Sequence, residues 1–213
     1  MKKQFAEILV LILISFGLYV NTIPNECALD DKMVIVKNDF TQKGIDGIGD
    51  ILSSDMMSGM FGDKSIVQGG RYRPLSMISF ALGVEFFNGD PHIMHFFNVL
   101  FYVFSIILLF KVLKKFFPDK KKEKFLSLAF IATLLYAAHP IHTEIVANIK
   151  GRDEIFSFLG AFGALWFAIK YSETRKPLNL LWIFVVFFLG LMSKEVAFTF
   201  LFVIPFSLWF FKI

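Results

Sequence analysis

Six apolar runs have lengths that approach the roughly 20 residues an α-helix needs to cross a bilayer. They cover residues 5–20, 96–113, 125–138, 155–171, 178–192 and 196–211. The chain is 56% hydrophobic and contains 29 Phe, which exceeds the apolar content of an ordinary soluble domain. Because lipid offers the backbone no hydrogen-bond partners, such runs must fold as helices. The sequence therefore predicts an all-α, polytopic membrane protein with about six transmembrane helices.

The first run follows Lys2 and Lys3, an arrangement that signal peptides and uncleaved signal anchors share. No small-x-small cleavage site comes after it, since the next residues are Asn-Thr-Ile-Pro-Asn. The pattern favours an uncleaved anchor. The third run is short, so the bilayer would have to thin around it.

Residues 21–74 are mostly polar and are predicted to form a long first extracytoplasmic loop. Four aliphatic residues within the loop recur at helical spacing, namely Ile45, Ile48, Ile51 and Leu52. They predict a short amphipathic helix at the membrane surface. The Gly pair at 69–70 then breaks the chain, and Pro74 suits the first turn of a helix that runs to about residue 87.

Charge is distributed unevenly between the two sides of the predicted membrane. With the N-terminus in the cytoplasm, the inner segments hold 13 of the 22 basic residues and only 4 of the 18 acidic residues. This is the positive-inside asymmetry. The basic residues cluster at the ends of apolar runs, which argues against a nucleic-acid partner despite a net charge of +4.

The same topology places most chemistry-bearing side chains on the outer side. They are Asp30, Asp31, Arg71, Arg73, His92, His95, His139, His142, Glu144, Lys150, Arg152, Asp153, Glu154, Lys194 and Glu195. Adjacent carboxylates are costly near hydrocarbon, so Asp30 and Asp31 suggest a functional site. Cys27 is the single cysteine, which excludes a disulfide within the chain, and no Cys/His spacing is typical of a zinc site.

Five motifs occur in order along the chain. They are Asp30-Asp31, Tyr72-Arg73-Pro74-Leu75, the segment 92–98 (HIMHFFN), the segments 139–144 (HPIHTE) with 151–154 (GRDE), and Ser193-Lys194-Glu195. Together they resemble the transmembrane-and-TPR family of protein O-mannosyltransferases, within the GT-C superfamily. The resemblance implies one GT-C-like transmembrane domain over residues 1–213, comparable to the N-terminal membrane part of the family. The family's C-terminal TPR array has no counterpart here, because no helical repeat of about 34 residues is found.

The resemblance also implies chemistry. A polyprenyl-phosphate sugar, usually mannose, would be transferred to Ser or Thr hydroxyls of an acceptor protein on the extracytoplasmic side. Asp30 or Asp31 would be the base, with Asp30 favoured, and the two could share a divalent cation. The alternative for this pair is a helix cap or a solvated loop.

The donor phosphate needs cations near the membrane surface. Arg152 and Lys194 are the first candidates, followed by Arg73 and Lys150, and the alternative for each is snorkelling to the interface. A second set, His139, His142 and Glu144, is predicted to lie in the substrate loop. Metal binding by the two histidines is disfavoured by the intervening proline, and Glu144 could instead pair with Arg152.

Two other functions compete with the enzyme. The first is a catalytically inactive membrane anchor or scaffold for a C-terminal TPR interaction region. The second is a transporter, which would need ionisable residues at mid-membrane, and the runs contain almost none. The Lys-, Ile- and Phe-rich composition favours a bacterial inner membrane, with the endoplasmic reticulum as the alternative.

Overall fold

The computed structural model describes residues 2–62, 71–119 and 126–213, and every regular element within these ranges is a helix. The elements are α1 (Lys2–Tyr19), η1 (Val20–Thr22), η2 (Lys32–Val36), α2 (Asp39–Gln42), η3 (Gly44–Gly47), α3 (Ile48–Ser53), α4 (Ser58–Phe61), α5 (Pro74–Phe87), α6 (Pro91–Phe116), α7 (Leu128–Ala137), η4 (Pro140–His142), α8 (Thr143–Ala147), η5 (Ile149–Gly151), α9 (Arg152–Thr174), α10 (Pro177–Ser193), η6 (Glu195–Thr199) and α11 (Phe200–Phe210). The predicted all-α class is confirmed.

Three helical segments are long and apolar enough to cross a membrane, namely Lys3–Thr22, Pro91–Phe116 and Ile149–Thr174. The other three predicted spans form shorter apolar helices. The shortest, α7, has 10 residues and is therefore about 15 Å long, half the thickness of a hydrocarbon core. The chain is a multi-span helical protein, and the count of six crossings stays a prediction.

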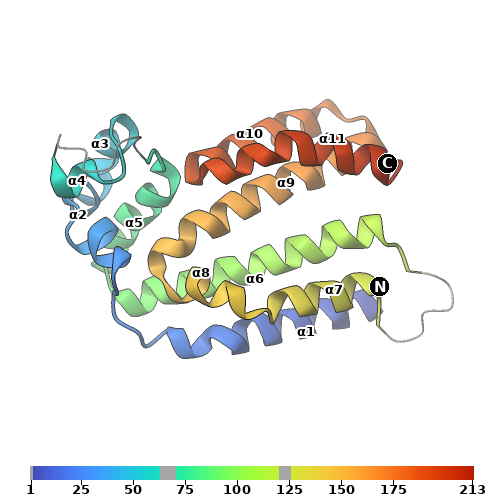
Figure 1. Ribbon diagram of the computed structural model, residues 1–213, viewed down its shortest axis with the longest axis horizontal. Coiled ribbons are helices and arrows are strands. Elements are labelled where there is room, and N and C mark those ends of the chain that lie inside the picture. Colours follow the sequence, from blue (N-terminus) through green and yellow to red (C-terminus); the bar gives the residue numbers. More distant parts are fainter. Residues whose placement is uncertain (1, 63–70, 120–125) are drawn as a thin grey trace.

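The helices lie side by side, and the polar segments gather at one end of the bundle (Figure 1). That end holds α2 to α5, the first turns of α6 and α9, and the last turn of α10. The opposite end holds the N-terminus, the end of α6 and the turn between α9 and α10. The partition matches the predicted outer and inner segments, although the basic run at 120–124 lies outside the described residues.

The end of the bundle that holds α2 to α5 has a core of its own, built by the first loop on α5. Val34, Ile35, Ile51 and Phe80 are buried in it. The predicted amphipathic helix is instead a short 3-10 turn, η3, followed by α3. Of its four aliphatic residues Ile51 is buried, Ile48 is half-buried, and Ile45 and Leu52 are exposed. The predicted break at 69–70 lies outside the described residues.

The turn between α5 and α6 follows from its residues. Pro74 occupies the first turn of α5, as predicted, and the helix ends at Asn88, whose φ of 54° is left-handed. Gly89 continues that conformation at φ 69°, where a residue without Cβ is favoured. Asp90 then caps α6 by accepting from the backbone N–H of His92 at 2.8 Å. These features turn the chain from α5 into α6, which begins at the end of the bundle that holds α2 to α5 (Figure 1).

The acidic residue inside the first apolar run, Glu7, has its partners at the opposite end of the bundle. Glu7 is buried, and its Oε1 accepts from the backbone N–H of Ser127 at 2.9 Å. Its Oε2 lies 3.5 Å from Nζ of Lys114. Ser127 in turn caps α7 through the N–H of Phe130. One carboxylate thus ties α1 to α6 and to the start of α7.

Candidate functional site

Polar side chains of the first loop meet those of α8, η5 and the start of α9. A polar cavity of about 290 Å³ opens there. Its lining includes Asp30, Glu144, Lys150, Asp153 and Glu154. The cavity therefore brings together motifs that lie more than a hundred residues apart in the chain.

The two adjacent aspartates have different surroundings. Asp31 is fully buried, and its Oδ1 accepts from the backbone N–H of Lys150 at 2.8 Å. Its Oδ2 accepts from the N–H of Ala28 at 3.3 Å. The side chain of Asp30 is 53% exposed and lies 4.0 Å from Nζ of Lys150. Asp31 thus anchors the loop onto η5, while Asp30 faces the cavity.

Arg73 and Lys150 meet at a buried carboxylate. Arg73 donates from Nη1 to Asp153 at 2.7 Å and from Nη2 to Glu195 at 2.9 Å. Nζ of Lys150 lies 3.6 Å from the same Asp153 oxygen. The other oxygen of Asp153, Oδ1, is buried and has no hydrogen-bond partner among the described residues. Asp153 therefore joins α5, η5 and α9 while keeping one acceptor free.

Lys194 is the third predicted phosphate ligand of the site. Its ammonium pairs with Glu154 across the gap between α10 and α9. Burial lowers the pKa of Lys194 from its ordinary value, and the charges of Arg73 and Lys150 add to that effect. Arg73 and Lys150 thus alternate with Asp30, Asp153 and Glu195 in one network, and Lys194 forms a separate pair with Glu154.

Arg152 lies deeper than the other predicted phosphate ligands and is buried at 3% exposure. Nε donates to Asn98 at 2.8 Å, Nη2 to the carbonyl of Met94 at 3.0 Å, and Nη1 to Oγ of Ser79 at 3.2 Å. The guanidinium also lies over the ring of Phe80, with its carbon 5.0 Å from the centroid. All its nitrogens are engaged by the protein, so Arg152 joins α5, α6 and α9.

The proposed pairing of Glu144 with Arg152 is wrong. Glu144 is exposed at the mouth of the polar cavity and has no ion-pair partner among the described residues. Arg152 bonds α5 and α6 instead. The pairing fails because η5 turns the chain between the two residues, which places Glu144 outside and Arg152 inside.

The histidines of the 139–144 segment have structural contacts. His139 caps η4, its Nδ1 accepting from the N–H of Ile141 at 3.2 Å. His142 is buried, with its ring centroid 4.4 Å from that of Tyr136 and 5.9 Å from that of Tyr102. No group of three or more His, Cys, Asp or Glu that could hold a metal ion is found in the described part of the chain.

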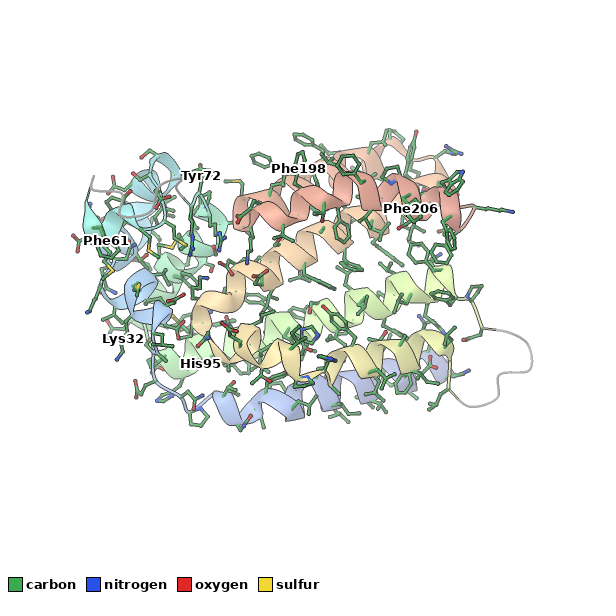
Figure 2. The ribbon with its side chains drawn as sticks, viewed as in Figure 1. Lys32, Phe61, Tyr72, His95, Phe198 and Phe206 are labelled. Carbon is green, nitrogen blue, oxygen red and sulfur yellow. The ribbon has the colours of Figure 1, made fainter. Side chains whose placement is uncertain are left out.

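Three participants had no role assigned from the sequence, namely Asp153, Glu154 and Glu195. Each lies beside a predicted cation in the motifs 151–154 and 193–195. The signal was the alternation of charge in these motifs, because cations gathered near hydrocarbon need counter-charges. His95, also in a motif, is buried at this end of the bundle (Figure 2), and neither ring nitrogen has a hydrogen-bond partner among the described residues.

Fold and site together define a multi-pass helical protein with a charged cavity at one end of its bundle. The sequence profile of the dolichyl-phosphate-mannose-protein mannosyltransferase family matches residues 74–212, and the chain belongs to that family. The resemblance drawn from the motifs is thereby confirmed.

Individual relatives agree with this assignment. Protein O-mannosyl-transferase F38B6.6 of Caenorhabditis elegans is 29% identical over 89% of the chain and 26% of its own length. Protein O-mannosyl-transferase TMTC3 of Homo sapiens is 34% identical over 51% of the chain and 11% of its own length. Protein O-mannosyl-transferase TMTC4 of Mus musculus is 27% identical over 90% of the chain and 28% of its own length. The chain thus spans less than a third of these relatives, and no solved structure matches it.

Proposed function

We propose that the protein is a glycosyltransferase that moves a sugar, mannose in view of its family, from a polyprenyl-phosphate donor to Ser or Thr hydroxyls of an acceptor protein on the extracytoplasmic side. One observation carries the proposal. The carboxylate of Asp30 is open to a polar cavity of about 290 Å³ and lies 4.0 Å from a lysine ammonium. A base, a cation and room for a sugar therefore coincide where the family motifs meet.

The reaction assigns a task to each group. The acceptor hydroxyl oxygen attacks the anomeric carbon, and the bond from that carbon to the phosphate oxygen breaks. The bonding electrons leave with the polyprenyl phosphate, and Asp30 takes the hydroxyl proton. Lys150, Lys194 and Arg73 are the proposed ligands of the leaving phosphate, whose charge they would stabilise.

In this proposal the remaining candidate residues support the site and take no part in the bond exchange. Asp31 and Arg152 are engaged by backbone and side-chain partners, which supports a role in holding the loop and the helices that carry the site. His139 and His142 shape the same wall, and Glu144 is available to an acceptor. A divalent cation shared by Asp30 and Asp31 stays a prediction, tested by adding EDTA to the assay below.

The membrane itself is part of the proposal. The bilayer and the cytoplasmic N-terminus are inferred from the apolar helices and from the charge distribution. A bacterial inner membrane stays favoured by composition, and the animal relatives keep the endoplasmic reticulum as the alternative. Localisation of the tagged protein distinguishes them.

The test is transfer of mannose from polyprenyl-phosphate mannose to a Ser/Thr peptide, in membranes that carry the full-length protein. Asp30→Asn should abolish transfer at equal protein level. Asp46→Asn, which changes an exposed carboxylate of η3 remote from the cavity, is the matched control and should transfer normally. Absence of transfer with every donor tried would reject the enzyme and favour the inactive anchor.

A further inference from the structure

A second cavity lies beside the polar cavity and has a more apolar lining. This one has a volume of about 190 Å³ and lies between α6, α7, α9 and η6. Its walls are mainly apolar and aromatic, with Tyr102, Phe158, Ala161 and Phe200 among them. Both cavities are lined by Ile145 and Glu154, so they meet at these two residues.

Of the ion pair formed by Glu154 and Lys194, only Glu154 lines the two cavities. Glu154 is bound to Lys194, and no other residue of the described chain forms an ion pair with that ammonium. The Lys194 side chain is 17% exposed, and Ser157 of α9 donates to its backbone carbonyl at 3.3 Å. Burial lowers the pKa of Lys194, so its ammonium is incompletely compensated for lost hydration. The phosphodiester of a sugar donor carries one charge, as Glu154 does, and the lipid monophosphate released by transfer carries up to two and would compensate the ammonium better.

The residue that carries the free acceptor lines the polar cavity. Asp153, only 1% exposed, lines the polar cavity and has its Oδ1 without a hydrogen-bond partner among the described residues. A buried acceptor without a donor costs free energy, which a ligand hydroxyl can recover. A sugar presents such hydroxyls, whereas an isoprenoid chain does not.

We infer that the donor lies across the Glu154–Lys194 pair, with its phosphate replacing Glu154 on Lys194, its sugar in the polar cavity and the first units of its polyprenyl chain in the apolar cavity. This inference rests on the proposed function. Glu154 is then a substitute anion that holds Lys194 in place while the site is empty. It competes with the phosphate, and so it sets the affinity for the donor and for the released lipid phosphate.

Binding of a polyprenyl monophosphate that carries no sugar tests the arrangement without requiring catalysis. The full-length protein in lipid nanodiscs is titrated with this probe. Removing the competing charge with Glu154→Gln should tighten binding about three- to tenfold. Asp46→Asn is the matched control, because it removes an exposed carboxylate that lines neither cavity. Equal tightening by both variants would mean a general charge effect and would overturn the role of Glu154.

The apolar cavity is tested at its exposed rim, where a large side chain does not disturb the core. Val196 is 53% exposed and lines the cavity, so Val196→Trp should narrow it and weaken binding about tenfold. Val203 of α11 is 37% exposed and does not line it, so Val203→Trp should bind like the unchanged protein. Equal binding by the two Trp variants would overturn the placement of the chain.

The transfer assay separates the two proposals. If the unchanged protein binds the probe and transfers mannose while the variants behave like it, the arrangement is wrong and the function stands. If it binds the probe with the expected differences between variants but transfers no mannose, the placement of the donor is supported and the proposed transferase activity is rejected. If it binds no polyprenyl phosphate at all, both are rejected.

Discussion

Arg73 and Asp153 are 80 positions apart in the chain and form an ion pair of 2.7 Å in which both side chains are at least 95% buried. The pair joins the start of α5 to the start of α9. Arg73 also reaches Glu195 on η6, so a single guanidinium connects three of the segments around the site. The planar fork of Arg suits this bridging geometry, which the single ammonium of Lys cannot reproduce.

Replacing Arg73 by Met should therefore destabilise the protein strongly. Asp153 would be left as a buried charge with only Lys150 near it, and removing one partner of a buried pair costs about 3–5 kcal/mol. Thermal unfolding in detergent measures the loss. Lys43→Met breaks the exposed pair of Lys43 with Asp50 and should leave the unfolding temperature unchanged. Equal effects of the two variants would contradict the buried role of Arg73.

The adjacent aspartates should separate into two phenotypes. Asp30→Asn removes the proposed base and should lower the transfer rate about 10²- to 10⁴-fold while stability is kept. Asp31→Asn should instead lower the free energy of unfolding by about 1–3 kcal/mol, because one of its two backbone donors then faces an amide NH₂. Rate and unfolding temperature are measured on both variants. A stable but inactive Asp31→Asn protein would reverse the assignment.

Local sequence signals predicted the α5 helix, because Pro74 marks its start and no distant partner is needed to place its end near residue 87. The gathering of Arg73, Lys150 and Lys194 at one end also followed from topology alone. The positions of their counter-ions could not be predicted from topology. The bond from Arg73 to Glu195, for example, spans 122 positions and depends on how α5, α9 and η6 pack. The same holds for the burial of Asp31 beside an exposed Asp30, which a turn of the loop decides.

The crossing of α9 and α10 should be sensitive to one methyl group. A Cβ added at Gly160 would lie 2.4 Å from the Cα of Gly190, and backbone cannot move aside cheaply. We expect Gly160→Ala to destabilise the protein by about 1–3 kcal/mol. At Gly163 the added Cβ would meet only Val186 Cγ2 at 3.6 Å, an ordinary contact. Gly163→Ala should thus be neutral or slightly stabilising through its better helix propensity, and unfolding curves of the two variants compare them.

Acid should lower the stability of the folded protein through protonation of His142. Burial lowers the pKa of His142 below its ordinary value of 6.5, and the charge of His139 adds to the effect. Below pH 6.5 the unfolded chain therefore takes up a proton that the folded protein refuses. Stability should fall as the pH drops from about 6.5 toward the lowered pKa and then level off.

His142→Phe should remove this component of the pH dependence. Phe keeps a ring against Tyr136, and it removes Nε2, which is buried without a hydrogen-bond partner in the described chain. Unfolding temperatures of the variant and the unchanged protein are compared from pH 8 to pH 5. The difference should favour the variant increasingly as the pH falls, because only the unchanged protein must keep a neutral imidazole at position 142. A difference that stays constant over this range would show that protonation of His142 does not oppose folding.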